Sequence, residues 1–206
     1  MAPPRLLAVA PDGWHADPAF PAALMAFRAA TEPLGGSAAV YLRAHGWSTA
    51  RWRGCLDGLA RPRKLRIGIT LPVDAELPED SELWTAAGVD FLHVPEVSAD
   101  RPLSVWAPLA LSRACHEPAS ARRRCHLGAN WLVVSPVFAT PSKPGGRPLG
   151  LLALAEAARA APGRVLALGG IDATGAHACL AAGAVGLAAQ RAAWAQTAEL
   201  TALLVA

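Results

Sequence analysis

Short apolar runs rich in valine, leucine and isoleucine alternate with longer alanine-rich stretches along the chain. A buried parallel strand is a nearly continuous apolar run, whereas an amphipathic helix places apolar residues every three or four positions. The alternation therefore predicts βα units around a buried parallel sheet. We expect eight strands, over residues 5–10, 38–43, 65–71, 89–94, 109–115, 131–135, 165–168 and 185–189.

The segments between these strands predict helices over residues 18–31, 49–59, 81–86, 117–127, 149–160, 174–182 and 191–204. Gly88, Gly128 and Gly183 each follow a helical stretch, where a left-handed C-cap residue is favoured. The fourth crossover contains three prolines and leaves room for about one helical turn. Eight units close a (β/α)8 barrel, so we predict an α/β fold: a single TIM barrel domain over residues 1–206 with a degenerate fourth helix.

Composition excludes several classes of protein. Hydrophobic residues make up 53% of the chain and charged residues 17%, which excludes a disordered chain. The net charge of +3 is weak and scattered, so no nucleic-acid partner is expected, and the arginines at 122–124 are interpreted as a solvated helix face.

Four widely spaced cysteines form no CxxC pair and favour a reducing, cytoplasmic location. No run of about 18 apolar residues and no export signal is present in the sequence, so no membrane partner is expected.

The loops after the last two strands combine features that suit a phosphate. Active sites of this fold lie at the carboxyl ends of the strands, often with a phosphate bound after strands seven and eight. Gly169 and Gly170 follow the seventh strand, and their amides can approach an anion closely. Arg191 begins the helix after the eighth strand and can bind the same anion. Alternatively, the glycines only permit a tight turn and Arg191 makes a structural contact.

The loop after the sixth strand, residues 135–150, holds hydroxyls and cations among prolines and glycines. Thr140 and Ser142 can donate hydrogen bonds and Lys143 supplies a positive charge, which suits an anionic ligand. The alternative is an ordinary polar surface loop.

Several motifs, in matching order and spacing, resemble the thiamine phosphate synthase/TenI family. They are GANW at 128–131, SPVF at 135–138, Thr140, SKPG at 142–145, PLGL at 148–151, ALGGI at 167–171, AGA at 182–184 and Gly186. The resemblance is strong over residues 115–194. Before that it is fainter: VYLR at 40–43 looks like the family's second-strand Leu-Arg-Glu-Lys segment, with Arg43 as its arginine, and residues 69–74 look like its Ile-Asn-Asp-Arg-Val-Asp segment.

The resemblance implies a barrel that binds a phosphorylated thiazole, with the phosphate held by the Gly170 loop and the backbone near Arg191 and Ala192. In the synthase, a pyrimidine pyrophosphate with magnesium is joined to this thiazole phosphate. Thr140, Ser142 and Lys143 fill the pyrophosphate-loop positions as the synthase requires.

Other family positions differ. His45 replaces a lysine, and Ala114 replaces a serine after strand five. Thr70 and Leu71 replace the Asn-Asp pair, and Ser98 aligns with the second family aspartate. Loss of metal-ligating carboxylates leaves a pyrophosphate poorly compensated, so we expect no cofactor, and magnesium only if the protein is a synthase.

TenI-type members also lack parts of the metal set, and some isomerise a thiazole carboxylate phosphate with a histidine after strand six. Pro136 stands at that position and cannot transfer a proton. Three histidines near strand ends, His45, His93 and His116, titrate in a suitable range. The position of His93 inside a strand favours a structural role over a catalytic one. The position of His116 close to a helix start favours neither. Glu96 is a further candidate general acid.

Three hypotheses follow. The leading one is a TenI-like protein that binds a thiazole phosphate or similar phosphate ester and acts, if it is an enzyme, as a metal-free tautomerase through His116 or His45. The second is thiamine phosphate synthase, with Glu96 or Asp74 recruited to magnesium. The third is a non-catalytic, ligand-binding regulatory barrel. The alanine-rich helix over 149–160 can pack on its own barrel or on a second subunit, so a homo-oligomer stays possible.

Overall fold

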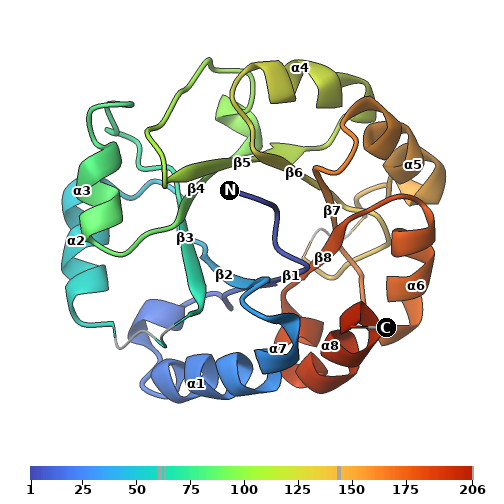
Figure 1. The fold of residues 1–206 in the computed structure, drawn as a ribbon, viewed down its shortest axis with the longest axis horizontal. Helices are drawn as coiled ribbons and strands as arrows, with labels where there is room; N and C mark the ends of the chain where they lie inside the picture. Colours follow the sequence, from blue (N-terminus) through green and yellow to red (C-terminus); the bar gives the residue numbers. More distant parts are fainter. Residues whose placement is uncertain (60–61, 63, 143–144, 206) are drawn as a thin grey trace.

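The computed structural model describes residues 1–59, 62, 64–142 and 145–205, and these form a closed eight-stranded parallel barrel surrounded by helices (Figure 1). Neighbouring strands pair in sequence order, and β8 pairs with β1 to close the ring, with Leu6 opposite Leu187. The strands are β1 (Leu6–Val9), β2 (Ala38–Leu42), β3 (Arg66–Thr70), β4 (Phe91–Val94), β5 (Ala110–Cys115), β6 (Trp131–Val134), β7 (Val165–Leu168) and β8 (Gly186–Ala189). The predicted TIM barrel is confirmed.

Helical segments cover the outside of the barrel. The α-helices are α1 (Phe20–Ala30), α2 (Thr49–Asp57), α3 (Ser81–Ala86), α4 (Ala121–His126), α5 (Gly150–Ala160), α6 (Ala173–Ala181), α7 (Arg191–Ala195) and α8 (Thr197–Val205). Short 3-10 turns are η1 (Trp14–Ala16), η2 (Glu32–Leu34), η3 (Glu96–Ser98) and η4 (Pro118–Ser120). The single helix predicted over 191–204 is interrupted at Gln196, and the one predicted over 117–127 begins as η4. No helix within the described ranges is long and apolar enough to span a membrane.

Each strand buries both of its faces, which explains the continuous apolar runs. One face points into the barrel, where Leu7, Val9, Tyr41, Phe91 and Trp131 pack together, and the other packs under the helices. The rings of Phe91 and Trp131 meet edge to face at 5.1 Å.

The fourth crossover is the irregular part of the barrel wall, because η3 replaces a full helix there. Arg113, fully buried on β5, donates hydrogen bonds to the carbonyls of Ala99 (2.6 Å), Arg101 (2.8 Å) and Leu127 (2.6 Å). Its guanidinium thus ties the crossover to β5 and to the end of α4. Burial lowers the pKa of Arg113 to about 10, which leaves it charged at neutral pH.

The interpretation of the arginines at 122–124 as a solvated face is wrong for Arg124. Arg122 and Arg123 are exposed, but the side chain of Arg124 is only 3% exposed. It donates to the carbonyl of Ala114 (2.6 Å) and also contacts the crossover through its ion pairs. The sequence could not distinguish the three arginines, because they are consecutive. In the structure, α4 buries the side chain of Arg124 and leaves the other two exposed.

Candidate active site at the mouth of the barrel

A cavity of about 420 Å³ opens at the carboxyl ends of the strands, inside the ring. Apolar side chains from the barrel interior, Leu7, Val9 and Val133, form part of its lining. Its polar lining residues come from β2, β4 and β5, from the segments after these strands, and from the position directly after β6: Tyr41, Arg43, His45, His93, Glu96, His116 and Ser135. The barrel therefore brings the candidate catalytic residues His45, His116 and Glu96 to one cavity.

His93 lies deepest among the three histidines and is 8% exposed. Its Nδ1 shares a hydrogen bond of 2.8 Å with the hydroxyl of Ser112. Desolvation by burial, followed by the positive fields of His45 and His116, lowers the pKa of His93 to about 3. Its imidazole is therefore neutral at physiological pH, and the hydrogen bond agrees with the structural role predicted for it.

Tyr41 packs its ring 4.6 Å from that of His93. Its hydroxyl bonds to the hydroxyl of Thr70 at 2.9 Å, and the same Thr70 oxygen accepts the amide of Ala44 at 3.1 Å. Burial raises the pKa of Tyr41 to about 12, although the Thr70 hydrogen bond and the charge of Arg43 oppose the shift. Thr70, which replaces a family asparagine, thus fixes a neutral phenol at the cavity wall.

His45 lies nearer to solvent, and its pKa is lowered by partial burial and by the charge of Arg43, while Asp12 acts in the opposite direction. A neutral imidazole is the form that accepts a proton, so this environment favours His45 as a general base.

Glu96 is held in a two-pronged ion pair. Arg124 donates from Nη1 to Oε2 (2.9 Å) and from Nη2 to Oε1 (2.7 Å) of its carboxylate. Burial lowers the pKa of Arg124, but its hydrogen bond and charge interaction with Glu96 outweigh burial and the pKa is raised overall. The bidentate contact occupies both carboxylate oxygens of Glu96.

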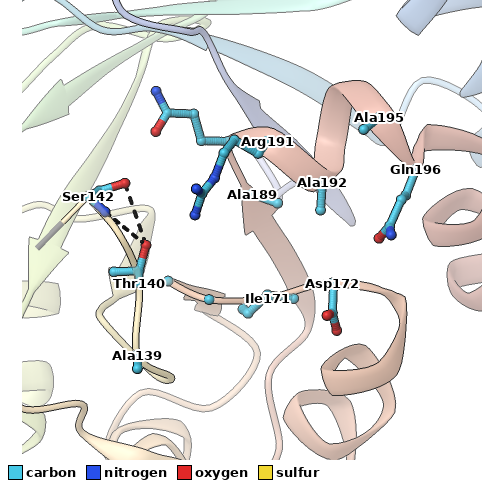
Figure 2. A pocket seen from close by; sticks show the side chains of 13 residues that line it. Ala139, Thr140, Ser142, Ile171, Asp172, Ala189, Arg191, Ala192, Ala195 and Gln196 are labelled. Atoms are coloured by element: carbon cyan, nitrogen blue, oxygen red, sulfur yellow. Dashed lines mark hydrogen bonds between the residues drawn. The ribbon is translucent and has the colours of Figure 1, made fainter. Parts of the chain in front are cut away.

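A second cavity, of about 390 Å³, lies where β7 and β8 end (Figure 2). It is lined by the four residues predicted to bind phosphate, Gly169, Gly170, Arg191 and Ala192, together with Thr140 and Ser142 from the loop after β6. Figure 2 shows Arg191 at the start of α7 extending its guanidinium toward that loop. Residues far apart in sequence thus line one cavity.

Gly169 and Gly170 have left-handed backbones, with φ of 102° and 65°. A Cβ on Gly170 would lie 2.4 Å from the carbonyl oxygen of Ala139. Among the described residues, the amides of Gly169, Gly170 and Arg191 donate to no acceptor. The glycines therefore serve tight packing and also leave donors available to a ligand.

The loop after β6 is joined to the β7 end by main-chain bonds. The amide of Val137 donates to Leu168 (2.9 Å) and that of Phe138 to Gly169 (2.9 Å). Beyond this anchor, the amide of Ser142 lies 3.4 Å from the hydroxyl of Thr140. Lys143, the predicted cation of this loop, falls outside the described residues.

The helix after β7 satisfies part of its own N-terminus. Asp172 accepts the amide of Gly175 (2.9 Å), and the Gln196 side chain accepts that of Ala173 (3.3 Å). These two bonds occupy the amides of Ala173 and Gly175, whereas no acceptor within the described chain takes the amides of the Gly169–Gly170 turn or of Arg191.

Comparison with known proteins agrees with this geometry. The family model described as thiamine monophosphate synthase matches residues 59–193, which is more than half of the chain. The chain belongs to the thiamine monophosphate synthase/TenI family. The match includes the strands β3 to β8 and both glycine positions of the second cavity.

Curated relatives are named thiamine-phosphate synthase. One from Gloeobacter violaceus is 34% identical over 114 residues, which are 54% of this chain and 33% of that protein. Another, from Roseiflexus castenholzii, is 39% identical over 109 residues, or 50% of this chain and 47% of the relative. The matches therefore span less than half the length of these relatives.

Solved structures share the fold. Thiamine phosphate pyrophosphorylase from Pyrococcus furiosus superposes with a TM-score of 0.62 at 18% identity, covering 97% of this chain and 95% of that one. The protein of the same name from Bacteroides thetaiotaomicron gives 0.63 at 17% identity, with 93% and 85% covered.

The magnesium ion that the synthase resemblance implies does not fit the residues of this family member. Leu71 offers an alkyl group where a carboxylate is needed. Asp74 instead accepts the amide (2.6 Å) and hydroxyl (2.9 Å) of Thr49 at the start of α2, and Glu96 is occupied by Arg124. In the described part of the chain, no three metal-ligating side chains are grouped to hold an ion.

Proposed function

We propose that this protein binds a thiazole phosphate or a similar phosphate ester across the two cavities, with the heterocycle in the barrel mouth and the phosphate between the Gly169–Gly170 turn and the start of α7. The observation that carries the proposal is that Gly169, Gly170 and Arg191, whose amides have no acceptor among the described residues, line one cavity at the carboxyl ends of the strands. Backbone amides and an arginine are the donors that phosphate oxygens favour. Family membership supports the heterocyclic part of the ligand.

For the reaction, we favour metal-free proton transfer on the bound ring, which is a tautomerisation. A neutral imidazole takes a proton from one ring position, and a proton is returned at another, so the atoms balance without a co-reactant. His45 and His116 line the mouth cavity and carry these roles in our proposal. His93 is less suited to acid catalysis, because its pKa of about 3 prevents it from holding a proton at neutral pH.

The second candidate function is thiamine phosphate synthesis. The names of the curated relatives and the Thr140–Ser142 segment beside the phosphate cavity favour it, whereas the residues at the magnesium positions do not. The experiment that separates the two incubates the protein with thiazole phosphate, hydroxymethylpyrimidine pyrophosphate and magnesium. Magnesium-dependent release of pyrophosphate establishes the synthase and rejects the tautomerase as the main activity.

The tautomerase is tested directly by solvent deuterium exchange into a thiazole carboxylate phosphate. We expect exchange and isomerisation without added metal, and a loss of at least about 100-fold in His45→Gln or His116→Gln. Because the pKa of His45 lies below its ordinary 6.5, the acid-side loss of activity should be centred below that pH. Binding of thiazole phosphate without any exchange or pyrophosphate release supports a regulatory barrel instead.

A further inference from the structure

Among the described residues that line the mouth cavity, the one arginine already has an anionic partner within the chain. Arg43 follows β2, and its Nη2 pairs with Oδ1 of Asp12 from the loop after β1. The two side chains differ in exposure: Arg43 is 27% exposed, whereas Asp12 is 84% exposed. The carboxylate therefore approaches the cavity cation from the solvent side.

The loop that carries Asp12 is firmly attached. The amide of Ala10 donates to Tyr41 (2.9 Å), and the indole of Trp14 donates to the carbonyl of Arg43 (3.2 Å). Trp14 is 2% exposed and stacks on Trp52 with ring centres 6.1 Å apart. Because both sides of Asp12 are fixed, its carboxylate is held beside Arg43 at a high effective concentration.

We propose that Asp12 is a specificity-determining residue: it competes with the ligand for Arg43, so that only anions carrying more than one charge displace it readily. The inference rests on the proposed function, because it concerns how an anionic ligand enters the same mouth cavity and meets Arg43 there. A singly charged carboxylate offers Arg43 no more than Asp12 already does. A phosphate or pyrophosphate brings more charge and more acceptor oxygens to the guanidinium fork.

Displacement of Asp12 is inexpensive, because the carboxylate is mostly in water and stays hydrated after it leaves. Exposed ion pairs are weak and are screened by salt. The charge of Arg43 lowers the pKa of His45 and that of Asp12 raises it, so the three side chains are close enough to interact electrostatically. The competition should therefore shift ligand affinity modestly without preventing binding.

The test is calorimetric titration of the full chain with inorganic pyrophosphate. We expect Asp12→Asn to bind pyrophosphate about 1.5- to 5-fold more tightly at low salt, with a smaller gain at high salt. The matched control is Asp17→Asn, which removes the same charge from the same loop. In the native chain the Asp17 carboxylate accepts the amide of Ala19 and does not pair with Arg43. The control should leave the affinity unchanged.

Two further variants show which arginine the Asp12→Asn substitution acts through. The gain from Asp12→Asn should vanish when Arg43 is replaced by glutamine, and it should persist in Arg191→Gln, where only the phosphate cavity is altered. An unchanged or weaker affinity in Asp12→Asn overturns the competition, as does a gain that survives loss of Arg43. Failure of pyrophosphate and thiazole phosphate to bind any variant overturns the proposed function as well, whereas equal affinities overturn the competition alone.

Discussion

Gly170 has two features that favour glycine: a left-handed backbone and no room for a side chain. Its φ of 65° suits glycine, and an added Cβ would meet the Ala139 carbonyl. Gly145 offers a matched comparison, because its φ is 74° and an added Cβ would meet nothing within 4 Å.

We therefore predict that Gly170→Ala lowers the free energy of unfolding more than Gly145→Ala does, since the latter pays only the left-handed backbone cost of about 1 kcal/mol. Gly170→Ala should also weaken phosphate binding, because the loop must move. Chemical denaturation and calorimetry check both effects. Equal destabilisation by the two variants would contradict the steric part.

His93 makes stability depend on pH. In the folded chain its pKa is about 3, whereas an unfolded histidine titrates near 6.5. Between these values only the unfolded chain binds the proton, so the contribution of neutral His93 is complete above pH 6.5 and is lost as pH falls toward 3.

The expected slope from this group is up to about 1.4 kcal/mol per pH unit. His93→Gln should flatten the acid side of the stability profile, and His177→Gln, at an exposed position on α6, should not. Urea denaturation at a series of pH values measures this. An unaltered acid slope in His93→Gln would refute the assignment.

At the scale of elements, the fourth crossover is held by arginine hydrogen bonds where a barrel ordinarily uses the apolar face of a helix. Three carbonyls, of Ala99, Arg101 and Leu127, meet the guanidinium of Arg113. Hydrogen bonds to charged groups are stronger than neutral ones.

Arg113→Met should accordingly destabilise the chain by about 2–4 kcal/mol and increase hydrogen exchange over residues 96–108. Arg122→Met, on the exposed face of α4, serves as the control and should change stability by no more than about 0.5 kcal/mol. Similar stabilities of the two variants, without a change in exchange, would show that the crossover is held by other contacts.

The elements themselves were largely predictable from the sequence. Apolar runs located all eight strands because both strand faces are buried, and Gly88, Gly128 and Gly183 adopt the left-handed backbone expected of helix caps. The same patterns could not show that Arg113 and Arg124 point inward, because burial of a charge depends on carbonyls and carboxylates distant in sequence.

The candidate site was predictable only in part. His45, His116 and Glu96 each follow a strand, so the barrel fold places them at the same end, where they line the mouth cavity. The pair Gly169–Gly170 marks the phosphate cavity. The pairings that neutralise Glu96 and Arg43 depend on side-chain directions, and no sequence pattern signals Asp12 as a partner of Arg43.

At the scale of the whole molecule, a ligand bound to the loops after β7 and β8 stabilises the ring where its first and last strands meet. Thiazole phosphate at 100 times its dissociation constant should add about 2.7 kcal/mol, which for a chain of this size raises the melting temperature by about 5–10 °C. The unphosphorylated thiazole and the Arg191→Gln variant should each give a much smaller shift in scanning fluorimetry. An equal shift from the unphosphorylated compound would exclude the phosphate cavity as the main source of affinity.

The packing of Trp14 against Trp52, with Trp47 at 4.8 Å from Trp52, places three indoles in close contact beside the loop that bears Asp12. Indoles held in fixed tertiary packing contribute a near-ultraviolet circular dichroism band. The protein thus contains its own optical reporter: a shift of this loop on ligand entry alters that band, with no external label attached.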